Sequence, residues 1–299
     1  MSPVTYRERP SGLRRPVLVV AFAGWNDAAE SATNAARLLR TSWGGDVMAT
    51  LDPEEFFHFG LTRPQVRMVP GTAEREILWP NMEFSLCREG SLSRDVVIGV
   101  GFEPHLRWKG FCRAVLDMAR ELEISLVVTL GALLAEVPHT RPVRLTGAAS
   151  DPELSALLGV RPTRYEGPTG IVGVLSTAAR EAGFSTASLW ANVPHYISAI
   201  ENPHATMALL RRLNRVLDGS LDLRELEESA AQFDAQLAEV LTQNRKVASY
   251  VRRLEAKDKE ADEPPAGSVS ELPDTRALVD EIERFLRQQS GPPPEEGSS

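Results

Sequence analysis

The chain has 299 residues, of which 42% are hydrophobic, a size that supports one large domain with an appendage. Its net charge is −8, and residues 201–299 hold 13 basic and 20 acidic side chains, so most of the negative charge lies in the last third. A nucleic-acid-binding protein needs a basic surface, so this balance excludes nucleic acid as a partner.

Cysteine content and hydropathy exclude two further classes of protein. Cys87 and Cys112 are too few for a disulfide framework or a zinc knuckle. The first apolar run, Val17–Ala23, is shorter than the roughly 20 residues of a membrane span, and no secretory signal is visible. We therefore expect a cytoplasmic protein with no membrane partner.

An arginine-rich, polar segment at residues 1–14 is expected to form a flexible arm. From residue 15 to residue 220, apolar strands alternate with helices. This alternation predicts an α/β body with a Rossmann-like, mostly parallel sheet and helices on both faces. Asp27 followed by Glu30 matches a capping box that starts a helix ending near residue 40. Strands are predicted at residues 17–23, 47–51, 66–69, 77–79, 94–100, 124–130, 143–146 and 187–193, and further helices at 108–122, 152–158, 170–182 and 202–217.

The pattern changes after Gly219, where residues 221–256 contain neither glycine nor proline and predict one long helix. Apolar residues recur in two series seven apart, which is the spacing of a heptad stripe. Leu241 and Ala248 widen that stripe, which favours packing in a helical hairpin or an oligomeric bundle over a free two-stranded coil. The two series are Leu223, Ala230, Leu237, Asn244 and Val251, and Leu226, Phe233, Val240, Val247 and Leu254.

The remaining residues divide into three predicted parts. Residues 257–273 have the polar, proline-containing composition of a linker. Residues 274–289 are expected to form an amphipathic helix with Leu278, Ile282 and Phe285 on one face. Residues 290–299 are expected to be disordered.

Polar clusters follow four of the predicted strands. The carboxyl ends of parallel strands share one edge of a sheet, where such folds hold their ligands, so these clusters could converge on one crevice. Glu166 and Thr169 precede a further predicted helix, whose first turn favours an anion. The clusters are Trp25, Asn26 and Asp27, then Glu103 and His105, then Glu136 and His139, and last His195 and Tyr196.

Each of these residues also has a structural interpretation. Asn26 and Asp27 are typical helix caps. The three histidines could act as acid–base groups or metal ligands, or could simply be hydrogen-bonded within loops and interfaces. Glu103 and His105 have no second matched pair, so no metal is expected. Gly167, Gly170 and Gly173 lack the dinucleotide-binding spacing and favour close packing of a helix on the sheet.

Motifs of known chemistry are absent. The sequence has no phosphate-binding loop, no Gly-x-Ser-x-Gly elbow and no His-Glu-x-x-His. Lys109 is the only lysine in the α/β body, so nothing positively supports ATP chemistry. No cofactor is expected, and a catalytic role is disfavoured.

Several motifs together resemble the actinobacterial branch of the proteasome assembly chaperone 2 family. They are Gly-Trp-Asn-Asp-Ala at 24–28, Leu-Asp-Pro-Glu-Glu-Phe-Phe at 51–57, Thr-Arg-Pro at 62–64, Gly-Phe-Glu-Pro at 101–104, Glu-Val-Pro-His-Thr-Arg-Pro at 136–142, and the stretch 165–196. The resemblance covers roughly residues 16–256.

The resemblance implies a Rossmann-like body with a C-terminal helical piece and self-assembly into small rings such as trimers. The best understood relatives guide assembly of proteasome α subunits without ATP, and some members carry a carboxylate–amine ligase label. The family supplies no accepted catalytic residues. The chain ends Pro-Glu-Glu-Gly-Ser-Ser at 294–299, without the hydrophobic-tyrosine-any motif of relatives that dock to the proteasome, so docking by the tail is not expected.

Three functional hypotheses follow. The leading one is a non-catalytic, ATP-independent oligomeric scaffold or assembly-chaperone-like protein, whose partners are other copies of itself and a client such as a proteasome subunit. The second is a small-molecule enzyme, a hydrolase or carboxylate–amine ligase, that uses Glu103, His105, His139 or His195. The third is an anion-sensing module. The ligand-binding candidates are Trp25, Asn26, Asp27, Glu166, Thr169 and Tyr196.

Overall fold

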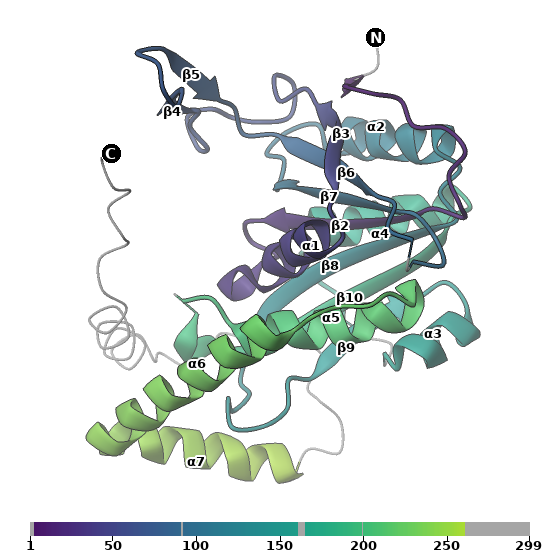
Figure 1. Cartoon of the computed structure of the whole chain (residues 1–299). Coiled ribbons are helices and arrows are strands. Elements are labelled where there is room, and N and C mark those ends of the chain that lie inside the picture. The colour runs from purple at the N-terminus through teal and green to yellow at the C-terminus, as the bar shows by residue number, and fades with distance from the viewer. Residues whose placement is uncertain (1–2, 91, 161–164, 199, 261–299) are drawn as a thin grey trace.

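A computed structural model describes residues 3–90, 92–160, 165–198 and 200–260 of the chain (Figure 1). The strands are β1 (Val4–Tyr6), β2 (Val17–Ala23), β3 (Asp46–Leu51), β4 (Gln65–Met68), β5 (Arg75–Leu78), β6 (Met82–Cys87), β7 (Val96–Phe102), β8 (Leu126–Ala135), β9 (Leu145–Ala149) and β10 (Ser185–Pro194). The helices are α1 (Ser31–Ser42), α2 (Trp108–Glu121), α3 (Pro152–Leu158), α4 (Ile171–Glu181), α5 (Pro203–Leu217), α6 (Arg224–Gln243) and α7 (Arg245–Glu260), with short 3-10 turns η1 (Ala28–Glu30) and η2 (His195–Ile197).

Eight strands form one mixed sheet in the order β1-β3-β6-β7-β2-β8-β10-β9. The four central strands β7, β2, β8 and β10 are parallel to one another. On one side β6, β3 and β1 each pair antiparallel with the next strand toward the centre of the sheet, and on the other side β9 pairs antiparallel with β10. The parallel strands are largely buried because both of their faces are covered, and β2 is a continuous apolar run, whereas β10 also holds buried polar residues such as Ser188 and Asn192. The predicted α/β fold class is confirmed, with the parallel strands as its core.

Helices cover the two faces of the sheet. Residues of α1 and α5 pack with one set of strand side chains, and residues of α2 and α4 pack with the alternate set. This division follows from the strand geometry, since successive side chains of β2 such as Val19 and Val20 point to opposite faces. Buried apolar surface on both faces is the main source of stability.

Two strands were not expected from the sequence. Residues 4–6 form β1, which pairs with β3, so the prediction of a flexible arm is wrong for these residues. The arm is fixed further by Tyr6, whose hydroxyl donates to Glu121 over 3.0 Å. Met82–Cys87 forms β6, whose residues Met82 and Phe84 are fully buried.

Strands β4 and β5 form a separate hairpin that projects from the body (Figure 1). Register places Val66 opposite Ile77, and Met68 lies on the same face, while Arg67 and Glu76 pair on the other face. The side chains of Val66, Met68 and Ile77 are 63%, 50% and 55% exposed. The hairpin therefore presents an apolar face that no other described part of this chain covers.

The predicted long helix at 221–256 is wrong, because the chain breaks at Asn244 into α6 and α7. Asn244 has extended dihedrals, φ −123° and ψ 99°, and its side-chain oxygen accepts the amides of Lys246 and Val247 at 3.0 and 3.2 Å. The two helices fold back on each other and form a helical hairpin (Figure 1).

The heptad residues form the core of this helical hairpin. Phe233, Leu237 and Val240 of α6 pack with Val247, Val251 and Leu254 of α7 against Tyr196 and Ile197 of η2. Helix α7 runs to residue 260, beyond the predicted start of the linker. The rest of the predicted linker, the helix at 274–289 and the tail at 290–299 lie outside the described residues.

Replacing Asn244 with Ala should destabilise the α6–α7 hairpin by about 1 kcal/mol, because the first amides of α7 lose their acceptor. Hydrogen exchange of the α7 amides, read by mass spectrometry, measures this loss locally. Gln243→Ala is the matched control, since that exposed side chain bonds only within its own helix, to Glu239. Equal exchange in both variants would contradict the capping role.

Candidate functional site

The carboxyl end of β2 lies at the point where the strand order of the sheet reverses. The chain leaves β2 toward the β7 side of the sheet, whereas α2 carries it from β7 across to β8 on the other side. Open α/β sheets bind their ligands at such switch points. Here the crevice is closed by the chain itself, because Asp27 forms a parallel bridge with Ala132, whose amide donates to the carbonyl of Asn26 over 2.8 Å.

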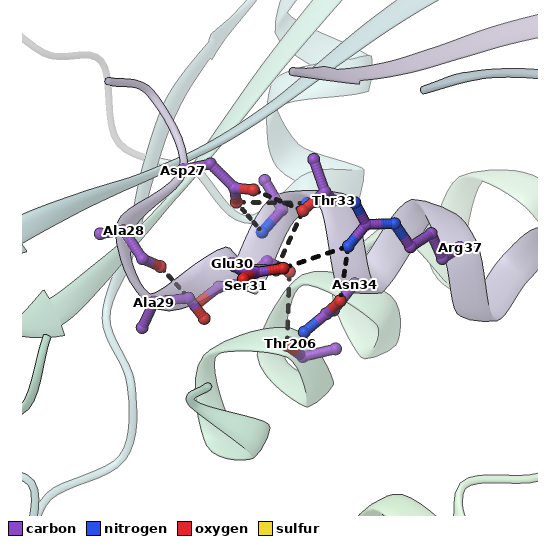
Figure 2. Close-up of polar contacts among 10 residues, drawn as sticks. Asp27, Ala28, Ala29, Glu30, Ser31, Thr33, Asn34, Arg37 and Thr206 are labelled. Atoms are coloured by element: carbon purple, nitrogen blue, oxygen red, sulfur yellow. Dashed lines mark hydrogen bonds and ion pairs between the residues drawn. The ribbon is translucent and has the colours of Figure 1, made fainter. Parts of the chain in front are cut away.

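Asp27 fixes the turn from β2 into α1 (Figure 2). Its Oδ1 accepts the amides of Ala32 and Thr33 at 2.7 and 3.2 Å, and its Oδ2 accepts the Thr33 hydroxyl. Burial raises the pKa of the Asp27 carboxyl, and these hydrogen bonds oppose that shift. Asp27 therefore caps the amino end of α1, although it does not directly precede the helix in the sequence, and this role is structural.

The predicted capping box has the wrong geometry. Helix α1 begins at Ser31, and Glu30 directly before it is left-handed, with φ 51°. Ala29 is left-handed as well, with φ 53°. Two consecutive left-handed residues other than glycine are strained, so this turn persists only because its surroundings fix it. One such contact is the Thr206 hydroxyl of α5, which donates to the carbonyl of Ser31 over 3.3 Å (Figure 2).

Glu103, which follows β7, occupies the amino end of α4. Its Oε1 accepts the amide of Ile171 at 2.8 Å and the side-chain amide of Asn26 at 2.7 Å. A carboxylate is the group that a helix amino end favours. The anion position that the sequence predicted at this helix is therefore filled by a side chain of the protein. Gly170 is required here, because a Cβ on it would lie 2.3 Å from the Asn26 side chain.

His105 lies away from Glu103, beside the loop that follows β3. Its Nδ1 accepts the amide of His58 at 3.2 Å, and its Nε2 lies 3.4 Å from the Thr62 hydroxyl. The ring also packs edge-on against Phe57. His105 thus orders this loop and has no polar contact with the other candidate residues.

His139, His195 and Tyr196 form a third cluster, under α7. The Tyr196 hydroxyl accepts the amide of His139 at 2.9 Å and is hydrogen-bonded to its Nδ1 at 2.7 Å, with the hydroxyl as donor in the tautomer that leaves Nδ1 unprotonated. His195 donates from Nδ1 to the carbonyl of Ala135 at 3.1 Å, and its Nε2 accepts the hydroxyl of Tyr250 at 3.0 Å. The bond from Tyr250 uses an unprotonated ring nitrogen of His195, whereas the Ala135 carbonyl raises the pKa of that ring.

The titration behaviour of this cluster follows from burial. Burial lowers the pKa of His139 to about 4, against the nearby carboxylates of Asp234 and Glu255, which raise it. Burial also lowers the pKa of His195 and raises the pKa values of Tyr196 and Tyr250. A general acid or base works best with a pKa near the working pH, and these shifts move the pKa of each group further from neutral pH.

A large hollow of about 1430 Å³ lies beside the switch point and along both flanks of α4. We call it the α4 groove. Trp25, which is 60% exposed, and Thr169 line it, whereas Glu166 is exposed and does not. The lining includes Trp25, Leu133 and Leu134 at one end, Lys109, Arg113 and Leu116 of α2, Val174 of α4, Trp190 of β10 and Thr146 and Ala148 of β9.

The α4 groove is bordered by one cysteine. Burial raises the pKa of the Cys112 thiol, which borders the groove, to about 11, so it is protonated at neutral pH. Among the described residues, no group of three or more His, Cys, Asp or Glu side chains could hold a metal ion. No helix in that part of the chain is long and apolar enough to cross a membrane.

The sequence-predicted residues therefore separate into three places. Asn26 bonds to Glu103 at the switch point, and the neighbouring Asp27 lines the adjoining groove together with Trp25 and Thr169. His105 lies on the β3 loop, and His139, His195 and Tyr196 lie under α7. Sequence reasoning missed Arg113 and Trp190 as groove residues, since a helix arginine and a strand tryptophan carry no distinguishing signal.

The comparisons with known proteins identify the fold family. The model of the PAC2 family matches residues 21–241, most of the chain. This chain belongs to the PAC2 family. A PAC2 family protein from Streptomyces avermitilis MA is 43% identical, with a TM-score of 0.72, over 79% of this chain and 99% of that chain.

Other PAC2-like structures extend the comparison. A proteasome-assembly chaperone homologue from Mycobacterium tuberculosis is 42% identical, with a TM-score of 0.72, over 79% of this chain and 99% of that chain. PbaB of Pyrococcus furiosus, an archaeal proteasome activator, is 20% identical, with a TM-score of 0.63, over 80% and 99% of the two chains, a likeness of fold alone. The comparison with curated proteins gives no match. The family resemblance seen in the sequence is confirmed.

Replacing Glu103 with Ala should lower the free energy of unfolding by about 1–3 kcal/mol, because the amides of Asn26 and Ile171 lose their acceptor. Glu103→Gln keeps an acceptor oxygen and should cost less. Urea denaturation followed by circular dichroism measures both variants. Equal stability of Glu103→Ala and the unchanged chain would contradict this structural role.

Stability should fall as the pH is lowered from 6.5 toward 4. His139 has a lower pKa in the folded chain than the ordinary 6.5, so the unfolded chain binds more protons in this window and acid favours unfolding. Urea midpoints at several pH values measure the slope. His139→Gln should flatten it, whereas His58→Gln, which changes an exposed loop histidine, should not. Identical slopes in all three proteins would be the contrary result.

Proposed function

We propose that this chain is a non-catalytic, ATP-independent, homo-oligomeric scaffold that acts as an assembly chaperone linked to the proteasome. Family membership supports a proteasome-linked role, since a relative of 42% identity is a proteasome-assembly chaperone homologue. The client is expected to be a proteasome subunit. The proposal concerns binding and positioning of proteins, with no chemical step.

The α4 groove is the observation that carries this proposal. Its volume of about 1430 Å³ exceeds the roughly 300–1,000 Å³ of most small-molecule pockets, and it lies open along a helix. Trp25 at 60% and Leu134 at 39% exposure place apolar surface at its mouth. Exposed apolar patches of this kind mark protein-binding surfaces, and Trp is a preferred anchor residue at interfaces.

The use of the polar candidates also supports binding over catalysis. The Glu103 carboxylate accepts hydrogen bonds from the Asn26 side chain and from the first amide of α4. His139 is hydrogen-bonded to Tyr196, and His195 is hydrogen-bonded to Tyr250 and to a backbone carbonyl. A proton gained or lost by any of these side chains would disrupt hydrogen bonds that hold the fold together. These groups and His105 face three different surroundings, whereas acid–base catalysis needs its groups within reach of one substrate.

The β4–β5 hairpin supports self-association. A two-stranded hairpin is at best marginally stable alone in water, and this one exposes Val66, Met68 and Ile77 on one face. A second copy of the chain that covers this face would bury those side chains and stabilise the hairpin. We assign the homo-oligomer contact to this surface and the client contact to the α4 groove.

The proposal predicts a complex with purified α subunits of the cognate proteasome, formed without nucleotide and detected by native mass spectrometry. Trp25→Ala should weaken it by about tenfold to a hundredfold, as expected for an aromatic anchor residue. Leu157→Ala is the matched control, because Leu157 is a similarly exposed apolar residue, 48% exposed, on α3.

Two results would contradict the proposal. One is the absence of any complex at micromolar concentration, or a complex that needs ATP. The other is a strict monomer at micromolar concentration in light scattering, which would remove the oligomeric scaffold. An Ile77→Lys variant should lower the oligomer mass while leaving the Trp25 surface intact, so the two parts of the proposal are tested separately.

A further inference from the structure

The described chain ends beside the α4 groove. Arg144 pairs with Asp258 in the last turns of α7, with 2.7 Å between Nη2 and Oδ1. Arg144 directly precedes β9, in which Thr146 and Ala148 line the groove. Two residues of strand span only about 7 Å. The chain beyond residue 260 therefore starts next to one wall of the groove.

The opposite wall of the groove carries positive charge without a partner. Lys109 and Arg113 lie one turn apart on α2, both are exposed, and both line the groove. Within the described residues neither makes a hydrogen bond or ion pair through its side chain, unlike Arg120 on the same helix, which pairs with Asp117 over 2.8 Å. An occupant of the groove should therefore bring carboxylates to this wall as well as apolar side chains to the floor.

The segment that follows the described chain has this chemistry. Residues 261–299 hold nine acidic and three basic side chains. Within residues 274–289, Leu278, Ile282 and Phe285 have the spacing of one helical face, and Asp274 and Glu281 have the spacing that places both on one flank of it. The 13 residues from 261 to 273 can span roughly 40 Å, enough to reach along the groove.

We propose that residues 274–289 bind in the α4 groove of their own chain. Leu278, Ile282 and Phe285 face the apolar floor, and Asp274 and Glu281 face Lys109 and Arg113. This inference rests on the proposed function in one respect: the groove is also the client surface. The segment and a client then compete for one surface, which includes Trp25 and Trp190.

Photo-crosslinking in the full-length chain tests this placement. p-Benzoylphenylalanine replaces Phe285 in one variant and Ile282 in another, and mass spectrometry locates the crosslinks after irradiation. We expect crosslinks to groove residues such as Leu116, Val174 and Trp190. The same probe at Arg287, on the opposite side of the predicted helix, should give a lower yield.

The crosslinks also separate this inference from its rivals. Mixing isotopically light and heavy chains should give crosslinks within one chain only. Crosslinks between copies, crosslinks confined to α6 and α7, or none at either probe position would each overturn the proposal. A groove that crosslinks to the segment yet binds no proteasome subunit would overturn the proposed function and leave this inference standing.

Charge reversal gives a second, independent measurement. Lys109→Glu with Arg113→Glu should lower the crosslink yield about three- to tenfold, as the loss of two exposed ion pairs implies. Adding Asp274→Lys and Glu281→Lys to that variant should restore the yield. Arg245→Glu with Lys246→Glu, an exposed pair at the start of α7, is the matched control with no expected change. Equal loss in this control, or no rescue, would overturn the proposed contact.

Discussion

The Glu103 carboxylate connects the parts of the fold on which the candidate site depends. It follows β7, accepts the side-chain amide of Asn26 from the turn after β2, and accepts the first amide of α4 at Ile171. Asn26 in turn accepts the amide of Ala132 from β8 through its carbonyl. One carboxylate and one asparagine thus hold three parallel strands and a helix at the switch point, where related folds leave a crevice for a ligand.

Because side chains of the protein occupy that crevice, the accessible apolar surface lies beside it. Since Asp27, Asn26 and Glu103 fill the switch point, the exposed apolar surface lies on the flanks of α4, bordered by Trp25 and Trp190. Such a surface suits the side of another polypeptide better than a small molecule enclosed on all sides. The closed crevice and the open groove are therefore two results of one set of hydrogen bonds.

The sequence was informative where local pattern decides structure. The apolar runs predicted the parallel strands, and the heptad residues predicted which side chains of α6 and α7 are buried. It failed where a distant contact decides. Asp27 and Glu30 have capping-box spacing, yet Ala29 and Glu30 turn left-handed because β8 and α5 fix the turn from outside.

The candidate site shows the same limit. The partners of His139 and His195 are Tyr196 and Tyr250, and Tyr250 lies 55 residues from His195, so no spacing could reveal them. Asn244 continues the heptad series, and only its side-chain hydrogen bonds distinguish a helix break from a buried polar residue. Lys109 stood out as the body's only lysine, but that it has no polar partner among the described residues is a property of the folded surface.

The bridge between Asp27 and Ala132 has a kinetic consequence. Residues far apart in sequence must meet before the turn after β2 can be held in its strained form, and such non-local contacts form slowly because loop closure costs entropy first. Trp25 is carried by that turn, and α4 is attached to it through Glu103. This end of the groove thus forms only when β2, β7, β8 and α4 are all in place, so a partly folded chain does not present the Trp25 surface.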